Sequence, residues 1–238
     1  MDTTVGPSSL LAQVSTLRFP PVPMAAAHNR EVFSRLSRME TFNYIVGADA
    51  VELVTPPKEG GEVMRIVIGR ETVTVALDPF MGSADFAAEQ LGAVLRELTG
   101  VLPIPVFIHS VHVLRKTMPL VGGAGDRGAE GKAADARTFI LQDVIQIPPE
   151  RLGGWKRPFA SVGVRFVFPP QQVNELSSHE LRVESFLQDP AKIFVEDTAS
   201  FLMPLPVGQW DTLKANLAEA NKFVDEYASA LLHSAPAQ

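Results

Sequence analysis

The chain has 238 residues, 46% of them hydrophobic, with 21 Lys and Arg against 27 Asp and Glu and a net charge of −6. It has no cysteine, which excludes disulfides, thiolate nucleophiles and cysteine-ligated metal clusters. The acidic excess lies after residue 174, because residues 1–174 hold 17 basic and 17 acidic side chains. Without a basic surplus the chain is a poor candidate for binding a phosphate backbone, so we expect no nucleic-acid partner.

Residues 1–16 are mostly small and polar, and we expect them to form a flexible N-terminus. This segment carries no early Lys or Arg, and its apolar content is too short and too mixed for a secretory signal. No apolar run approaches the ~18 residues that a membrane span needs. The sequence therefore predicts a cytoplasmic protein without a membrane partner.

The first half of the chain alternates between strand and helix patterns. Three prolines in residues 17–23 fix φ and predict an extended stretch. A short helix should follow, because Val32, Leu36 and Met39 fall on one helical face. The further expected elements are one strand or two at 44–54, a hairpin at 64–68 and 72–77, a helix from Ser83 to Leu98, and a strand at 106–114.

The second half opens with residues 122–136, which are rich in Gly and Ala and should form a flexible loop. Apolar and alternating patterns after this loop predict strands at 138–147, 159–168, 180–187 and 193–202. A long C-terminal helix should follow, because its apolar residues repeat at spacings of three and four. These residues are Trp210, Leu213, Leu217, Ala220, Val224, Tyr227 and Leu231. Such a seam is more typical of a helix packed on its own core than of a dimer interface.

These elements predict the α+β class, with one or two mostly antiparallel sheets and helices packed on one face. Strands lead into a helix in both halves of the chain. We therefore interpret residues 17–120 and 138–232 as two related βα halves of a single domain, 17–232, with a flexible tail at 233–238.

Two histidines are the first candidates for a ligand site. His109 and His112 lie three residues apart in an expected strand, where side chains at that spacing point to opposite faces. They cannot both bind one metal ion without distortion, so we expect no metal site. We take His109, His112 and Arg115 as the candidate ligand-binding residues, with Asp78 as their neighbour in a cleft.

Two tryptophans are candidates for partner binding. Trp155 is followed by Lys156 and Arg157 in an expected loop, and a Trp beside Arg is typical of an interface anchor. The alternative is a ring folded back onto the core. Trp210, at the start of the last helix, is the second candidate.

No catalytic motif is present. The sequence lacks Gly-x-Ser-x-Gly and His-Glu-x-x-His. Gly131-Lys132 is not a phosphate loop, because Asp126 stands where the first glycine would be and Ala133 follows the lysine. The acidic residues Glu196 and Asp197 have no evident catalytic partner, so we assign no catalytic residue.

Several segments together carry a family resemblance, in their order and pattern. These are residues 73–75, Ser83-Ala84-Asp85-Phe86 with its helix, the strand 106–114, residues 187–190 with 195–197, and the C-terminal helix. In these features the chain resembles a sporadically distributed family of uncharacterised bacterial proteins. The resemblance implies an α+β fold and a bacterial protein, and it supplies no activity.

We therefore expect a non-enzymatic protein with an assembly or accessory role, which binds a protein partner or a second copy of itself and uses no cofactor. The alternative hypothesis is a small-molecule binding protein or an enzyme, whose site would lie between the sheet and a helix.

Overall fold

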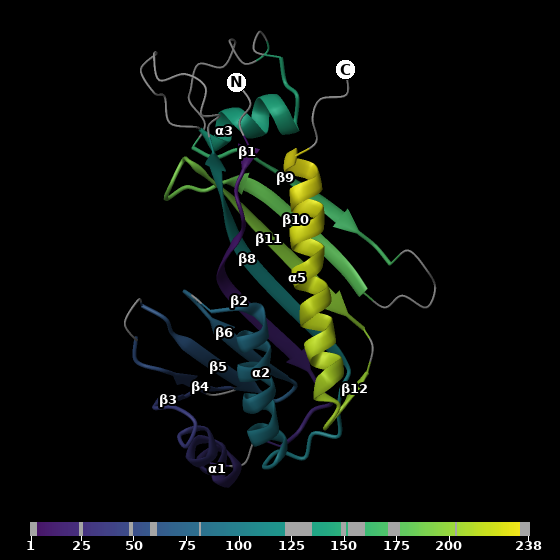
Figure 1. The fold of residues 1–238 in the computed structure, drawn as a ribbon. Helices are drawn as coiled ribbons and strands as arrows, with labels where there is room; N and C mark the ends of the chain where they lie inside the picture. The colour runs from purple at the N-terminus through teal and green to yellow at the C-terminus, as the bar shows by residue number, and fades with distance from the viewer. Residues whose placement is uncertain are drawn as a thin grey trace.

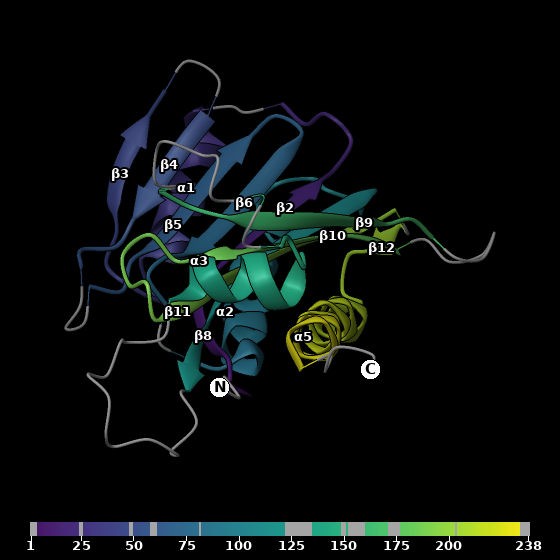
Figure 2. The same cartoon turned by 90° about the horizontal axis from the view of Figure 1, so that it is seen from above.

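The computed structural model describes residues 4–23, 26–47, 50–57, 61–80, 82–121, 135–148, 151, 160–170, 177–202 and 204–233. These residues form an α+β fold in which one large antiparallel sheet carries helices on one of its faces (Figures 1 and 2). The predicted fold class is confirmed. None of the described helices combines the length and the hydropathy that crossing a membrane requires.

The large sheet has the strand order β3-β4-β5-β6-β2-β8-β11-β10-β9, and β1 pairs with the end of β8. Every one of these pairs is antiparallel. The strands are β1 Thr4–Val5, β2 Ser9–Arg18, β3 Asn43–Val46, β4 Ala50–Val54, β5 Met64–Gly69, β6 Thr72–Leu77, β8 His109–Val121, β9 Gly163–Phe168, β10 Ser177–Ser185 and β11 Lys192–Phe201. A small second sheet pairs β7 Val106–Phe107 with β12 Leu205–Pro206.

The order of elements repeats along the chain. In the first half β2 leads to helix α1 (Ala26–Leu36), then to β3 through β6, and then to helix α2 (Ala84–Thr99). In the second half β8 leads to helix α3 (Ala136–Phe139), then to β9 through β11, and then to helix α5 (Trp210–His233). The two leading strands, β2 and β8, pair at the centre of the sheet. Each half then extends outward from this central pair.

Alternation along the strands separates the sheet into two faces. On β6 the odd-numbered residues 73, 75 and 77 are buried, and on β11 the odd-numbered residues 193–201 are buried. We call the face that packs against the helices the covered face and the opposite one the open face. Figure 2 shows α2, α3 and α5 together on one side of the sheet. No described helix packs against the open face.

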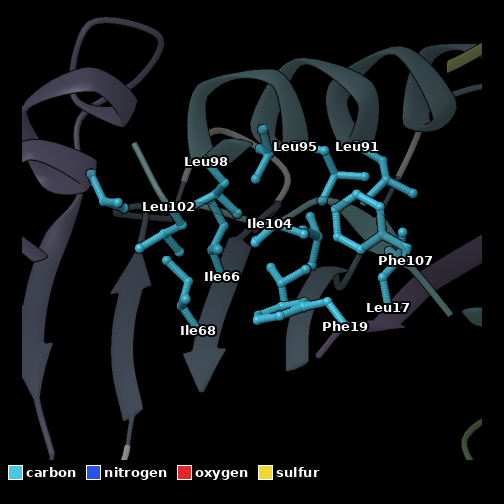
Figure 3. Close-up of a cluster of buried hydrophobic side chains, with 14 of the residues drawn as sticks. Leu17, Phe19, Ile66, Ile68, Leu91, Leu95, Leu98, Leu102, Ile104 and Phe107 are labelled. Atoms are coloured by element: carbon cyan, nitrogen blue, oxygen red, sulfur yellow. The ribbon is translucent and has the colours of Figure 1, made fainter. Parts of the chain in front are cut away.

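The first-half core lies between α1, α2 and the covered face (Figure 3). Ser83 begins α2, because its side chain accepts a hydrogen bond from the Phe86 amide at 3.2 Å. One face of that helix then buries Leu91, Leu95 and Leu98 against Ile66 and other strand residues. Burying such side chains contributes about 1.5–3 kcal/mol each. The N-cap and the core face of this helix both follow from the sequence.

The second-half core lies beneath α5, which runs beside α2 across the sheet (Figure 1). The buried residues of α5 are Leu213 and Leu217, which belong to the first-half core, and Ala220, Val224, Ala228 and Leu232, which belong to the second. The buried line therefore passes from Val224 to Ala228, and Tyr227 is 39% exposed. An unsupercoiled helix drifts away from a strict heptad seam in this way. The helix is confirmed, and its seam faces the sheet of its own chain.

Two predicted segments are wrong. The sequence predicts a flexible N-terminus at 1–16, but the described residues of this segment include β1 and most of β2, which pairs with β6 on one side and β8 on the other. The sequence predicts a strand at 138–147, but α3 continues into a π-helical turn at Ile140–Val144. The Asp135 side chain caps this helix by accepting a bond from the Arg137 amide at 3.0 Å. A short apolar run does not by itself distinguish a strand from a buried helix.

Candidate functional site

The open face is a surface of the sheet that none of the described helices covers. Its residues come from the strand positions that alternate with the buried ones, and most are partly exposed. Over β4, β5 and β6 these residues include the apolar Ala50, Val54, Val67 and Ala76 beside Glu52, Arg65, Thr72 and Thr74. Over β8, β10 and β11 they include six charged side chains, Arg115, Glu180, Arg182, Glu184, Lys192 and Glu196. We call the first part of the face the apolar half and the second part the charged half.

In the charged half, Glu196 on β11 lies between two arginines from the neighbouring strands. Arg115 Nε on β8 donates to Glu196 Oε2 at 2.7 Å, and Arg182 on β10 donates to Oε1 at 3.1 Å. Arg182 also donates to Glu184 at 3.2 Å. The Glu196 side chain is only 13% exposed. Each of its oxygens thus accepts a charge-assisted hydrogen bond, and the three side chains form a ladder across the strands.

The charged half joins the apolar half at Arg115 and Asp78, whose side chains approach to 3.6 Å. Asp78 lines a groove of about 670 Å³ on the apolar half. The residues lining this groove are Val14, Glu52, Val54, Val63, Arg65, Val67, Thr74, Ala76 and Asp78. The other two charged residues of the groove, Glu52 and Arg65, form an ion pair, because Arg65 Nε lies 2.7 Å from Glu52 Oε1. The groove therefore offers valine side chains between charges that already have partners.

A second polar group lies on the covered face, beneath α5. His112 is fully buried, and its Nδ1 lies 2.9 Å from the Ser15 hydroxyl on β2. Burial, together with a smaller contribution from repulsion by His109, lowers the pKa of His112 to about 3. His112 is therefore a neutral ring at physiological pH.

The same buried layer holds His179 on β10 and Asp197 on β11. His179 Nδ1 lies 2.9 Å from Asp197 Oδ2, and both side chains are almost inaccessible to solvent. Burial raises the pKa of Asp197, and the hydrogen bond from His179 acts against this increase. The Phe223 ring of α5 stacks on His179 with ring centroids 3.7 Å apart. The pair is thus sealed by the helix.

The structure does not bring the three predicted ligand-binding residues together. His112 lies on the covered face, whereas His109 and Arg115 lie on the open face. His109 Nε2 is 2.7 Å from the Ser200 hydroxyl, and Arg115 belongs to the ladder described above. The prediction that the two histidines point to opposite faces is confirmed. Asp78 does lie beside Arg115, as a shared cleft would require.

Of the predicted partner-binding residues, Trp210 is described and is half-buried. Its ring packs against Phe107 at a centroid distance of 6.4 Å, within the first-half core. Trp155, Lys156 and Arg157 lie outside the described residues. Their role in partner binding stays a prediction.

Sequence reasoning missed the His179–Asp197 pair. The alternation of β10 and β11 could have placed both residues on the same face, but only the register shows that they are diagonal neighbours. Among the residues that the structure describes, no three His, Asp or Glu side chains gather as a metal site would require. Comparison of the chain with family models and with curated proteins found no match. The family resemblance noted from the sequence therefore stays a prediction.

Proposed function

We propose that this protein is a non-enzymatic binding or assembly protein of the cytoplasm, and that it holds a protein partner on the open face of its sheet. The observation that carries the proposal is the open face itself. It extends over strands from both halves of the fold, and no described helix covers it. Sheets built from antiparallel strands often leave one face in water, but that face is then largely polar. Here a groove on the apolar half has four valines and an alanine among its nine lining residues.

The groove supplies the apolar centre that a protein interface needs. Val14, Val54, Val63 and Val67 line it, and they come from separate parts of the first half. Protein interfaces commonly combine an apolar centre with a polar rim. Glu52, Arg65 and the ladder through Arg115 would form that rim. The proposed partner is therefore a protein segment that places apolar side chains in the groove and polar groups over the rim.

The charges of the open face favour a protein over a nucleic acid. Arg65, Arg115, Arg165 and Arg182 each lie within ion-pairing distance of a carboxylate. Phosphate binding requires cations that are available to replace counterions. Lys116 adds nothing to this face, because it is buried on the covered face and its Nζ lies 2.7 Å from Asp225 Oδ1. These four arginines of the open face are thus paired with carboxylates of the same face.

The experiment compares the full-length protein with a double variant, Val54→Glu with Val67→Glu, in native mass spectrometry of complexes captured from the source cells. Both positions are on the open face, so the fold should survive. A matched control, Lys222→Glu, places a new acid on the exposed side of α5. The proposal predicts a protein partner, or a second copy, that the wild type and the control retain and the double variant loses.

Two results would contradict the proposal. One is a strictly monomeric wild type that no partner accompanies. The other is a partner that the double variant still binds as well as the wild type does, because that partner would then occupy a different surface.

A further inference from the structure

Three buried polar atoms on the covered face have no hydrogen-bond partner among the described residues. One is Gln13 Oε1 on β2, and the other two are His112 Nε2 and Asp197 Oδ1. Each of the latter two belongs to a side chain whose other polar atom is satisfied, His112 Nδ1 by Ser15 and Asp197 Oδ2 by His179. Both side chains are fully buried. Buried polar groups are almost always hydrogen-bonded, so these two atoms in one layer need a shared explanation.

The strand register places the His112 and Asp197 atoms on neighbouring positions. His112 on β8 is paired with Ala199 on β11, and Ala199 is paired on its other side with His179 on β10. Asp197 lies two residues from Ala199 and therefore on the same face. It is a diagonal neighbour of both histidines. Asp197 is hydrogen-bonded to His179, its diagonal neighbour on β10. Its diagonal neighbour on β8 is His112.

Three neighbouring side chains bound the region between the two imidazoles. Ala199 stands between them in the row and contributes only a methyl group. Phe201 closes one side, with its ring centroid 5.8 Å from that of His112 and 6.3 Å from that of His179. Phe223 of α5 closes the helix side by stacking on His179. A space with polar atoms on two walls is the kind that holds a buried water.

We infer that one water molecule is bound over Ala199 and bridges His112 Nε2 to Asp197 Oδ1. Water suits this position because it can donate and accept at once, whichever tautomer His112 adopts. The bridge completes a hydrogen-bonded chain from Ser15 through His112 and Asp197 to His179. This chain links strands β2, β8, β11 and β10, and so ties the first half of the fold to the second. The site is independent of the open face and of the partner proposed for it.

The direct test is a crystal structure of the full chain at a resolution that shows ordered water. We expect one density peak within hydrogen-bonding distance of both His112 Nε2 and Asp197 Oδ1. In solution, NMR should show cross-relaxation between the His112 ring protons and a long-lived water. A direct hydrogen bond between His112 and Asp197, or a dry space with no such cross-relaxation, would overturn the inference.

A filling variant supplies the second measurement. Ala199→Val places two methyl groups where the water would sit, and we expect the water cross-peak at His112 to be lost while the protein stays folded. Ala76→Val makes the same change on the open face and should leave the cross-peak unchanged. If Ala199→Val does not fold, His112→Phe removes one of the two bonding atoms, and the density peak should then disappear from its crystal structure. A peak that persists in either variant would contradict the bridge.

Discussion

His179 and Asp197 form a buried pair across two neighbouring strands, with the imidazole Nδ1 2.9 Å from the carboxylate Oδ2. They are diagonal neighbours, because His179 is opposite Ala199 and Asp197 is opposite Leu181. The pair lies between the sheet and Phe223 of α5. The contribution of this pair to the free energy of unfolding therefore depends on the packing of α5 against the second half of the sheet.

The first prediction concerns the titration of Asp197. Its folded-state pKa is raised above the ordinary value of 3.8, so its carboxyl favours the folded state at low pH and loses that contribution as pH rises through the folded-state pKa. Asp197→Asn cannot titrate. As pH rises from the ordinary pKa of 3.8 to the folded-state pKa, the unfolding free energy of the variant should therefore rise relative to that of the wild type. Above the folded-state pKa the difference should stay level. Urea unfolding across the pH range measures this difference, and a constant difference would contradict it.

The pH dependence of stability that we expect from His112 has the opposite sign to that from Asp197. Its folded-state pKa of about 3 lies below the ordinary 6.5, so its contribution to stability is complete above pH 6.5 and is lost as pH falls. At pH 5 the loss should reach about 2 kcal/mol, at about 1.4 kcal/mol for each pKa unit. His112→Gln should remove this part of the acid sensitivity in denaturant titrations. His28→Gln, on α1, controls for the chemical change itself, and equal curves for the two variants would refute the assignment.

The Lys116–Asp225 pair should respond differently to loss of each partner. Lys116 is buried on β8, and Asp225 of α5 accepts hydrogen bonds from its Nζ at 2.7 Å and from Ser8 at 2.9 Å. Asp225→Ala strands a buried ammonium and should destabilise by about 1–3 kcal/mol. Lys116→Met replaces the cation with an apolar chain of similar length and should cost less. Equilibrium unfolding of both variants decides this, and the reverse order would show that the ion pair is not what holds α5 here.

Adjacent residues on β5 test the division into two faces. Ile66 is fully buried on the covered face, whereas Val67 lines the groove of the open face. Val67→Glu should change the unfolding free energy by less than about 1 kcal/mol. Ile66→Glu buries an unpaired carboxylate and should prevent stable folding. Thermal denaturation followed by circular dichroism compares them, and similar losses would mean that the open face is covered in solution.

The local part of this fold could be predicted from the sequence. The hairpin of β5 and β6 follows from alternating β-branched residues, and the start of α2 follows from Ser83. β2 could not be predicted from its own residues, because what orders it is pairing with β6 and β8, which are distant in sequence. The prediction of a strand at 138–147 was wrong for a different reason. The apolar run at 140–144 fits either a strand or a buried helix.

The polar site on the covered face lay beyond sequence reasoning for a related reason. His112, His179 and Asp197 come from three strands, and Ser15 comes from a fourth. Alternation within one strand shows which face a residue occupies, but the register between strands decides which residues meet. The opposite orientations of His109 and His112 needed only the first kind of information, and that prediction is confirmed.

We propose above that the open face holds a protein partner. The most direct test of this proposal is native mass spectrometry of the full-length protein captured from its own cells, beside the Val54→Glu/Val67→Glu variant and the Lys222→Glu control. We expect one additional protein mass that is present with the wild type and the control and absent with the open-face variant. A complex that survives in the open-face variant, or a wild type found only as a monomer, would contradict it.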